Sequence, residues 1–117
     1  MREIKAYIQR SAVSSVVRAL EEGGAPGITI VEIHPVGYGY EPRYFDLGAD
    51  TDEVLRAYRH LSVVKIEVVC TSHHVGRFVE IIRKHASTGS KGDGMIFVSN
   101  VESAVRIRDG AHGVDGL

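Results

Sequence analysis

A β-α-β pattern occurs twice in this sequence and leaves few folds open to it. Strand-like runs alternate apolar and polar residues, and between the strands apolar residues recur every three or four positions, as on one helix face. The expected strands cover residues 3–9, 28–33, 63–70 and 95–99. The first helix is expected to be capped by Ser11 and to end at Gly23-Gly24, and Ser72 is expected to cap the second.

Two such units in 117 residues predict an α+β fold of the ferredoxin-like βαββαβ type, with four antiparallel strands and two helices on one face. The length fits one domain over residues 1–117. The opposite face of the sheet carries apolar residues such as Val63 and Val69. Because that face would otherwise be wet, we expect self-association to cover it.

Composition narrows the classes of partner. The net charge is −1, so no strong positive field favours nucleic acid or an anionic membrane. The single cysteine, Cys70, lies in an apolar run, which indicates a reduced, buried thiol. No apolar stretch reaches the length of a membrane span, and no signal peptide is evident. A soluble, cytoplasmic protein is the expectation.

The segment Thr88–Gly94 is the first candidate for a ligand site. Three of its residues are glycines, which tolerate positive φ and let an anion approach backbone N–H groups. Further on, Val105-Arg106-Ile107-Arg108 would project both guanidinium groups from one face if it were extended. A glycine-rich loop and two arginines together indicate a phosphate site. Lys91 could bind phosphate or simply solubilise the turn.

A long segment, residues 37–60, separates the two β-α-β units. It is too long for a hairpin turn, and its first half contains glycine, proline and three tyrosines, namely Tyr38, Tyr40 and Tyr44. Long loops in compact domains usually have a function, and exposed tyrosines are common on recognition surfaces. A loop that merely tolerates length is the alternative.

Four strings in order resemble the PII nitrogen-regulatory family of signalling proteins. The family's C-terminal signature, close to TGxxGDGKIFV followed by IRIRTG, is similar to residues 88–98 and 105–110. Its VKIEIVV strand resembles residues 64–70, and its GMTVTEV strand resembles residues 27–33. The glycine string alone would be weak, but four blocks over nearly the whole chain are specific.

The resemblance implies a homotrimeric regulator that binds ATP, ADP or AMP in clefts between subunits. Its long loop, the T-loop, would control a membrane transporter or a metabolic enzyme of nitrogen or carbon metabolism. The nucleotide-binding residues that it implies are Gly27, Ile28, Thr29, Gly37, Tyr38, Glu67, Val69, Thr88, Gly92, Asp93, Gly94, Met95, Arg106 and Arg108. The residues that it implies for partner binding are Tyr40, Arg43 and Tyr44.

Within that set, the resemblance assigns roles. Backbone N–H groups of residues 92–94 would cradle phosphates, and Arg106 and Arg108 would approach them with fork-shaped hydrogen bonding. Thr29 and Glu67 would lie near the ribose and the base.

The chain also departs from the family pattern. Met95 stands where the family usually has Lys, and Tyr38 where it tends to have Arg. Fewer cations near the outer phosphates predict that ADP or AMP competes well with ATP. Gly39 stands where the family has a glutamine that helps to hold Mg-ATP and 2-oxoglutarate, which argues against 2-oxoglutarate sensing. Mg²⁺ could still accompany ATP. Bicarbonate is another candidate effector. The tyrosine that is uridylylated in many members is absent.

Other classes remain open at this point. Six histidines raise the alternative of a metal-responsive trimer, similar to copper-tolerance folds, although no ligand spacing is present. A structural trimer that has lost its ligand is a third possibility. No enzyme is expected, because no Walker string or nucleophile set occurs and the simplest role of Asp93 is to fix its own turn. The tail, 110–117, is expected to be flexible unless nucleotide orders it.

Overall fold

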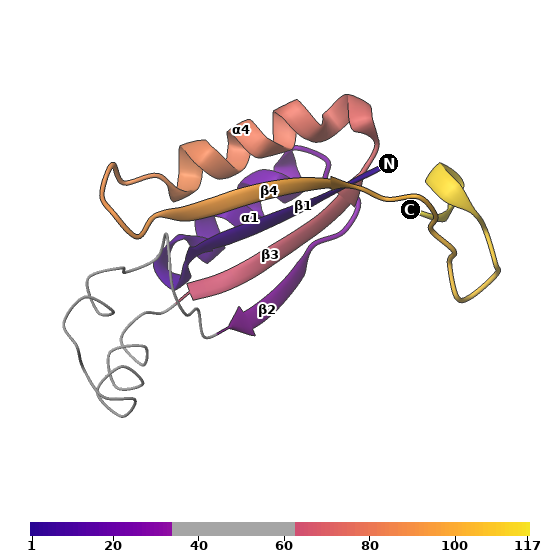
Figure 1. Ribbon diagram of the computed structural model, residues 1–117, viewed down its shortest axis with the longest axis horizontal. Helices are drawn as coiled ribbons and strands as arrows, with labels where there is room; N and C mark the ends of the chain where they lie inside the picture. The colour runs from indigo at the N-terminus through magenta and orange to yellow at the C-terminus, as the bar shows by residue number, and fades with distance from the viewer. Residues whose placement is uncertain (34–62) are drawn as a thin grey trace.

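The computed structural model describes residues 1–33 and 63–117 (Figure 1). Four strands alternate with two helices along the chain, each helix preceded by a short 3₁₀ turn. The strands are β1 (Arg2–Gln9), β2 (Thr29–Ile33), β3 (Val63–Cys70) and β4 (Gly94–Asn100). The helices are α1 (Val13–Glu22) and α4 (Val75–Ala86), and the 3₁₀ turns are η1 (Arg10–Ala12), η2 (Ser72–His74) and η3 (Gly113–Gly116).

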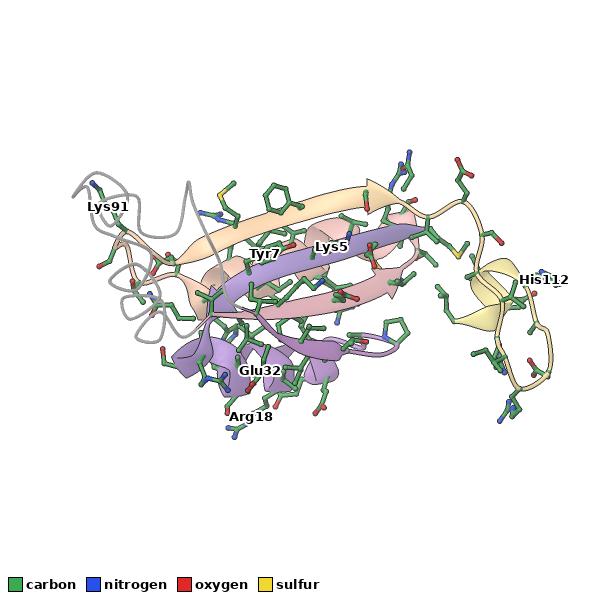
Figure 2. All side chains as sticks on the ribbon, turned by 60° about the horizontal axis from the view of Figure 1, so that its bottom comes forward. Lys5, Tyr7, Arg18, Glu32, Lys91 and His112 are labelled. Carbon is green, nitrogen blue, oxygen red and sulfur yellow. The ribbon has the colours of Figure 1, made fainter. Side chains whose placement is uncertain are left out.

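The strands form one antiparallel sheet in the order β2-β3-β1-β4. Strand β1 is central because it pairs with both β3 and β4, so that Lys5 lies opposite Glu67 on one side and Phe97 on the other. The helices lie together behind the sheet (Figures 1 and 2). This arrangement confirms the predicted α+β, ferredoxin-like architecture.

The core lies between the sheet and the two helices. Alternate residues of β1 and β3 face it, which is the expected consequence of the period-two pattern. Its members include Ile4, Ala6, Ile8, Val16, Leu20, Val64, Ile66, Val68, Cys70, Phe78, Ile82 and Ala86. Cys70 is buried as expected, and burial raises the pKa of its thiol.

The apolar residues left uncovered on the opposite face of the sheet are not the ones that the sequence suggested. Val63 is buried and Val69 is half-buried, whereas Met95 and Phe97 of β4 are about half exposed. Phe97 packs edge-on against the ring of Tyr7, with centroids 5.8 Å apart. In the described part of the chain, no helix is long and apolar enough to cross a membrane.

Both predicted helix caps are wrong. Ser11 and Ser72 lie inside 3₁₀ turns that precede the helices, and neither helix has a side-chain hydrogen bond at its N-cap. Near the second helix, Thr71 Oγ1 instead lies 2.9 Å from Nδ1 of His74. The 3₁₀ turns move each α-helix start about one turn beyond the serine that looked like a cap.

The segment Val105–Arg108 is not a fifth extended strand. Val105 forms an isolated bridge with His112, and residues 107–109 form a turn that folds the tail back. The reversal is closed by hydrogen bonds from the Arg106 N–H to the Ala111 carbonyl and from the Gly110 N–H to the Arg106 carbonyl, both 2.8 Å long. These hydrogen bonds define one conformation of the tail. That residues 110–117 are flexible unless nucleotide orders them stays a prediction.

Candidate functional site

The glycine loop, residues 88–94, connects α4 to β4 and is organised by Asp93. The Asp93 carboxylate accepts the backbone N–H of Thr88 at 2.7 Å and that of Gly89 at 3.0 Å. It also accepts a short hydrogen bond from the Thr88 hydroxyl. These bonds, the hydroxyl first among them, lower the pKa of Asp93 below its usual range. This geometry matches the turn-fixing role considered for Asp93.

The same loop contains glycines that no other residue can replace without strain. Gly92 and Gly94 have φ of 91° and 110°, in the region that side chains with a Cβ rarely adopt. A Cβ on Gly94 would also lie 1.7 Å from the carbonyl oxygen of Tyr7. Gln9 of β1 supports the loop from outside, since its Nε2 donates to the Gly92 carbonyl at 3.1 Å.

Some backbone donors of the glycine loop have no partner in the part of the chain that the structure describes. In the described residues, no hydrogen bond uses the backbone N–H groups of Lys91 or Gly92. The Lys91 side chain is exposed, and Met95 beside the loop is 48% exposed. The loop can therefore offer N–H groups and one cation to an anion, while Met95 adds no charge.

A second group of site residues lies where β2 and β3 meet. Thr29 is directly opposite Glu67 in the pairing of these strands, and both border a shallow pocket. The pocket is lined by Pro26, Gly27, Thr29, Glu67, Val69 and Leu117. Its volume of about 260 Å³ lies just under the usual range of about 300–1,000 Å³ for small-molecule sites.

The charge of this pocket is partly balanced. Lys65 Nζ lies 2.8 Å from Glu67 Oε1, and this contact raises the pKa of Lys65. Glu67 Oε2 has no partner among the described residues. As far as residues 1–33 and 63–117 show, the pocket thus offers a hydroxyl and one carboxylate oxygen to a ligand.

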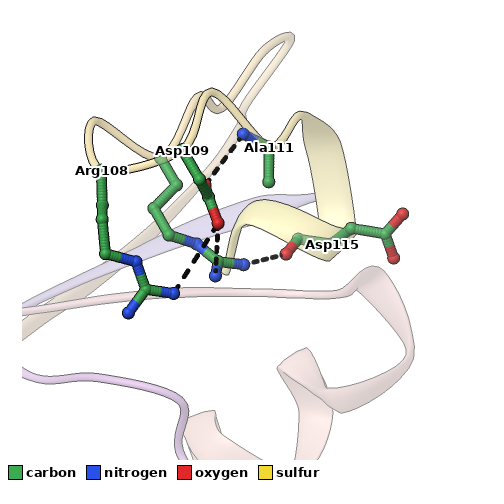
Figure 3. Close-up of polar contacts among 5 residues, drawn as sticks. Arg108, Asp109, Ala111 and Asp115 are labelled. Carbon is green, nitrogen blue, oxygen red and sulfur yellow. Dashed lines mark hydrogen bonds and ion pairs between the residues drawn. The ribbon is translucent and has the colours of Figure 1, made fainter.

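The two arginines meet at one carboxylate rather than at an open anion site. Asp109 Oδ2 lies 3.3 Å from Arg106 Nη1 and 3.7 Å from Arg108 Nη2 (Figure 3). Arg106 also donates a short hydrogen bond to the Asp115 carbonyl. The Arg108 side chain is 78% exposed and that of Arg106 only 33%, so Arg108 is the more accessible cation.

Within one copy of the chain, the structure does not bring the predicted phosphate residues together. The glycine loop with Lys91 lies at one end of the long axis, and the tail with His112 lies at the other (Figure 2). Strand β4 separates the two. The pocket of Thr29 and Glu67 includes Leu117 of the tail, so it belongs to the second end. The candidate site is therefore split into two half-sites.

Several predicted residues are outside the described part of the chain. Gly37 and Tyr38 of the nucleotide set lie there, as does the partner-binding set of Tyr40, Arg43 and Tyr44. Ile28 precedes β2 and packs against the core. Among the described residues, no group of three or more histidine, cysteine or acidic side chains could hold a metal ion.

Sequence reasoning missed Gln9, Asp109 and Leu117. Gln9 contacts a residue 83 positions away in the chain. Leu117 lines a pocket whose other residues come from β2, β3 and the turn before β2. No local pattern signals such contacts. Asp109 had a usable signal, because Asp-Gly is a frequent turn pair and would have argued against an extended Val105–Arg108.

Comparison with known proteins agrees with this architecture. The family model "Nitrogen regulatory protein P-II" matches residues 1–111. Proteins named "Nitrogen regulatory protein P-II" from Bradyrhizobium diazoefficiens and Mesorhizobium japonicum are 38% and 41% identical to this chain over 117 residues, covering all of both chains in each comparison. "Nitrogen regulatory protein P-II 1" from Methanothermobacter thermautotrophicus is 38% identical over 117 residues, which is all of this chain and 97% of its own length. The chain therefore belongs to the P-II family of nitrogen regulatory, signal-transducing proteins.

Proposed function

We propose that this P-II protein is an adenine-nucleotide sensor that works as a homotrimer, with each nucleotide bound between two copies. The observation that carries the proposal is the division of the site. The glycine loop, at one end of the sheet, has backbone N–H donors without a partner among residues 1–33 and 63–117, and the Thr29–Glu67 pocket lies at the other end. Two copies packed side by side can supply both halves to one ligand.

The chemistry of each half fits one part of a nucleotide. The N–H groups of Lys91 and Gly92 suit phosphate oxygens, because backbone donors at positive-φ glycines form anion-binding concavities. The Thr29 hydroxyl and Glu67 Oε2 suit ribose hydroxyls or an exocyclic amine. Arg108 is accessible for a phosphate.

The exposed sheet face supports the oligomer. Met95 and Phe97 leave an apolar strip on β4 that water would otherwise cover. Burying such surface between copies is favourable by about 25 cal/mol per Å². A closed ring then forms three equivalent clefts.

The proposed output is control of a partner, either a membrane transporter or a metabolic enzyme, through residues 37–60. Ligand binding would shift the equilibrium between conformations of that segment. No reaction is assigned to the site, and the metal-responsive alternative gains no support from the described residues.

Calorimetric titration with ATP, ADP, AMP and cyclic AMP, with and without 2-oxoglutarate or bicarbonate, tests the proposal. We expect at least one adenine nucleotide to bind with a stoichiometry of one per chain. Absence of binding by all four nucleotides would overturn it. A melting temperature raised by Zn²⁺ or Cu²⁺ but by no nucleotide would favour the metal-responsive class instead.

A further inference from the structure

A pocket lined mainly by α1 lies apart from both half-sites of the proposed nucleotide cleft. Its volume of about 440 Å³ falls within the usual range of about 300–1,000 Å³ for small-molecule sites. Figure 2 shows Arg18 of α1 apart from Lys91 of the glycine loop and from His112 of the tail. The polar residues that line this α1 pocket are Ser11, Ser14, Ser15, Arg18, Glu22 and His85.

The spacing of these residues places them on one face of the helical segment 11–22. They recur every three or four positions, from Ser11 in η1 to Glu22 at the end of α1. Val16 and Leu20 are buried on the opposite face and hold α1 against the core. The core-facing side therefore fixes which polar side chains α1 presents to the pocket.

Helix α4 supplies the other wall. The Ser15 hydroxyl oxygen lies 3.0 Å from Nδ1 of His85, which joins the two helices at the pocket. Just beyond the end of α1, a Cβ on Gly23 would lie 2.7 Å from Cδ1 of Ile81 in α4. Because the helices approach each other this closely, the two walls are held at a defined separation.

The pocket contains opposite charges that do not pair with each other. Arg18 and Glu22 are four residues apart on α1, a spacing at which side chains are neighbours. In residues 1–33 and 63–117, neither side chain takes part in an ion pair. The order of the two residues explains this, since a cation that precedes the acid is the less favourable arrangement. Both charged groups can therefore interact with a ligand.

We propose that the α1 pocket binds a small zwitterion of the α-amino-acid class. The Arg18 guanidinium suits the ligand's carboxylate, to which the hydroxyls of Ser11 and Ser14 can also donate. The Glu22 carboxylate suits its ammonium group. One ligand with both groups satisfies Arg18 and Glu22 together, which a simple anion or a simple amine cannot do. The site goes beyond the proposed nucleotide function and does not depend on it.

NMR titration of the isotope-labelled full chain tests the site with L-alanine, L-serine, L-glutamine and L-glutamate as probes. Each should bind, because the pocket recognises the two groups that all of them share. The charged side chains are exposed to water, so we expect dissociation constants of about 0.1–10 mM. The backbone amide signals of residues 11–22 should shift, whereas those of the glycine loop should not.

Compounds and variants that lack one charge test the pairing of groups. L-Alanine should bind about ten times more tightly than propionate or ethylamine, each of which has only one of its charged groups. Arg18→Gln should weaken L-alanine binding about tenfold, and Glu22→Gln should abolish the preference for L-alanine over propionate. Arg77→Gln and Glu21→Gln are the matched controls, because these exposed residues do not line the pocket. They should leave the affinity unchanged.

Three results would overturn the inference. The first is that no probe shifts the signals of residues 11–22 at about 20 mM. The second is that propionate binds as tightly as L-alanine, which would make the pocket a simple anion site. The third is that Arg18→Gln or Glu22→Gln, shown to be folded by circular dichroism, binds L-alanine like the unmodified protein. Nucleotide binding is measured in separate titrations, so a failure here is distinguishable from a failure of the proposed function.

Discussion

Gly94 lies directly against the backbone of Tyr7, so that a Cβ on the glycine would stand 1.7 Å from the Tyr7 carbonyl oxygen. This contact joins the end of the glycine loop to the central strand β1. The backbone of Gly94 also has a φ of 110°, which adds strain to any substitution. The position of the loop therefore depends on one residue without a side chain.

Gly94→Ala should lower the free energy of unfolding by about 3 kcal/mol, because strain and overpacking act together. Gly89→Ala is the matched control, since Gly89 has a φ of 81° but a Cβ there would meet no atom within 4 Å. Gly89→Ala should lower the free energy of unfolding by only about 1 kcal/mol, because backbone strain acts there alone. Urea unfolding at one protein concentration measures both. Equal losses in the two variants would contradict the contact.

The hydrogen bonds to Asp93 predict a pH-dependent contribution to stability. Because they lower its folded-state pKa, their contribution is complete above the usual Asp pKa of 3.8 and is lost as the pH falls below it. Asp93→Asn should cost about 1 kcal/mol at pH 7. The difference between variant and unmodified protein should shrink below about pH 4. Urea unfolding at several pH values tests this, and a difference that stays constant down to about pH 3 would contradict it.

Met95 should limit affinity for the longer phosphate chains. It is 48% exposed beside the glycine loop and carries no charge, so ATP should bind less than ten times more tightly than ADP. Met95→Lys adds a donor worth about 1.5 kcal/mol to a phosphate and should raise ATP affinity about tenfold. Met95→Gln is the uncharged control. Calorimetry in which Met95→Lys leaves the ATP-to-ADP ratio unchanged would refute the prediction.

Phe97 should be essential for the oligomer. It is 51% exposed on the sheet face away from the helices, and a carboxylate there would be costly to bury between copies. Phe97→Asp should yield monomers by sedimentation analysis, under conditions in which the unmodified protein is a trimer. Lys84→Asp, on the exposed side of α4, should not change the mass. A trimeric Phe97→Asp protein would show that another surface holds the copies together.

The fold was predictable because its strands carry their pattern locally. Alternation over 63–70 matched β3 residue for residue, and β1 and β4 began one residue earlier than predicted. The helix caps failed because a serine inside a 3₁₀ turn has the same local sequence as a serine at an N-cap. The alternation in Val105–Arg108 is compatible with an extended segment, but the Asp109-Gly110 turn reverses the chain there.

The site was only partly predictable, because it depends on contacts between distant segments. The glycines and Asp93 lie within seven consecutive residues, and the structure shows the turn-fixing hydrogen bonds that were considered for Asp93. The contact of Gln9 with Gly92 and the place of Leu117 beside Thr29 require the strand order of the sheet. A single sequence does not contain that order in any local pattern.

A mixed-subunit experiment tests most directly whether two copies share each nucleotide. Gly92→Asp disables the glycine loop by adding a negative charge, and Thr29→Tyr fills the pocket on the exposed edge of β2. Each variant alone should bind no nucleotide. After the two are denatured and refolded together, every mixed ring contains one intact cleft, so calorimetry should recover about one quarter of the original sites. A mixture that binds no nucleotide, although mixed trimers are present, would contradict a site shared between copies.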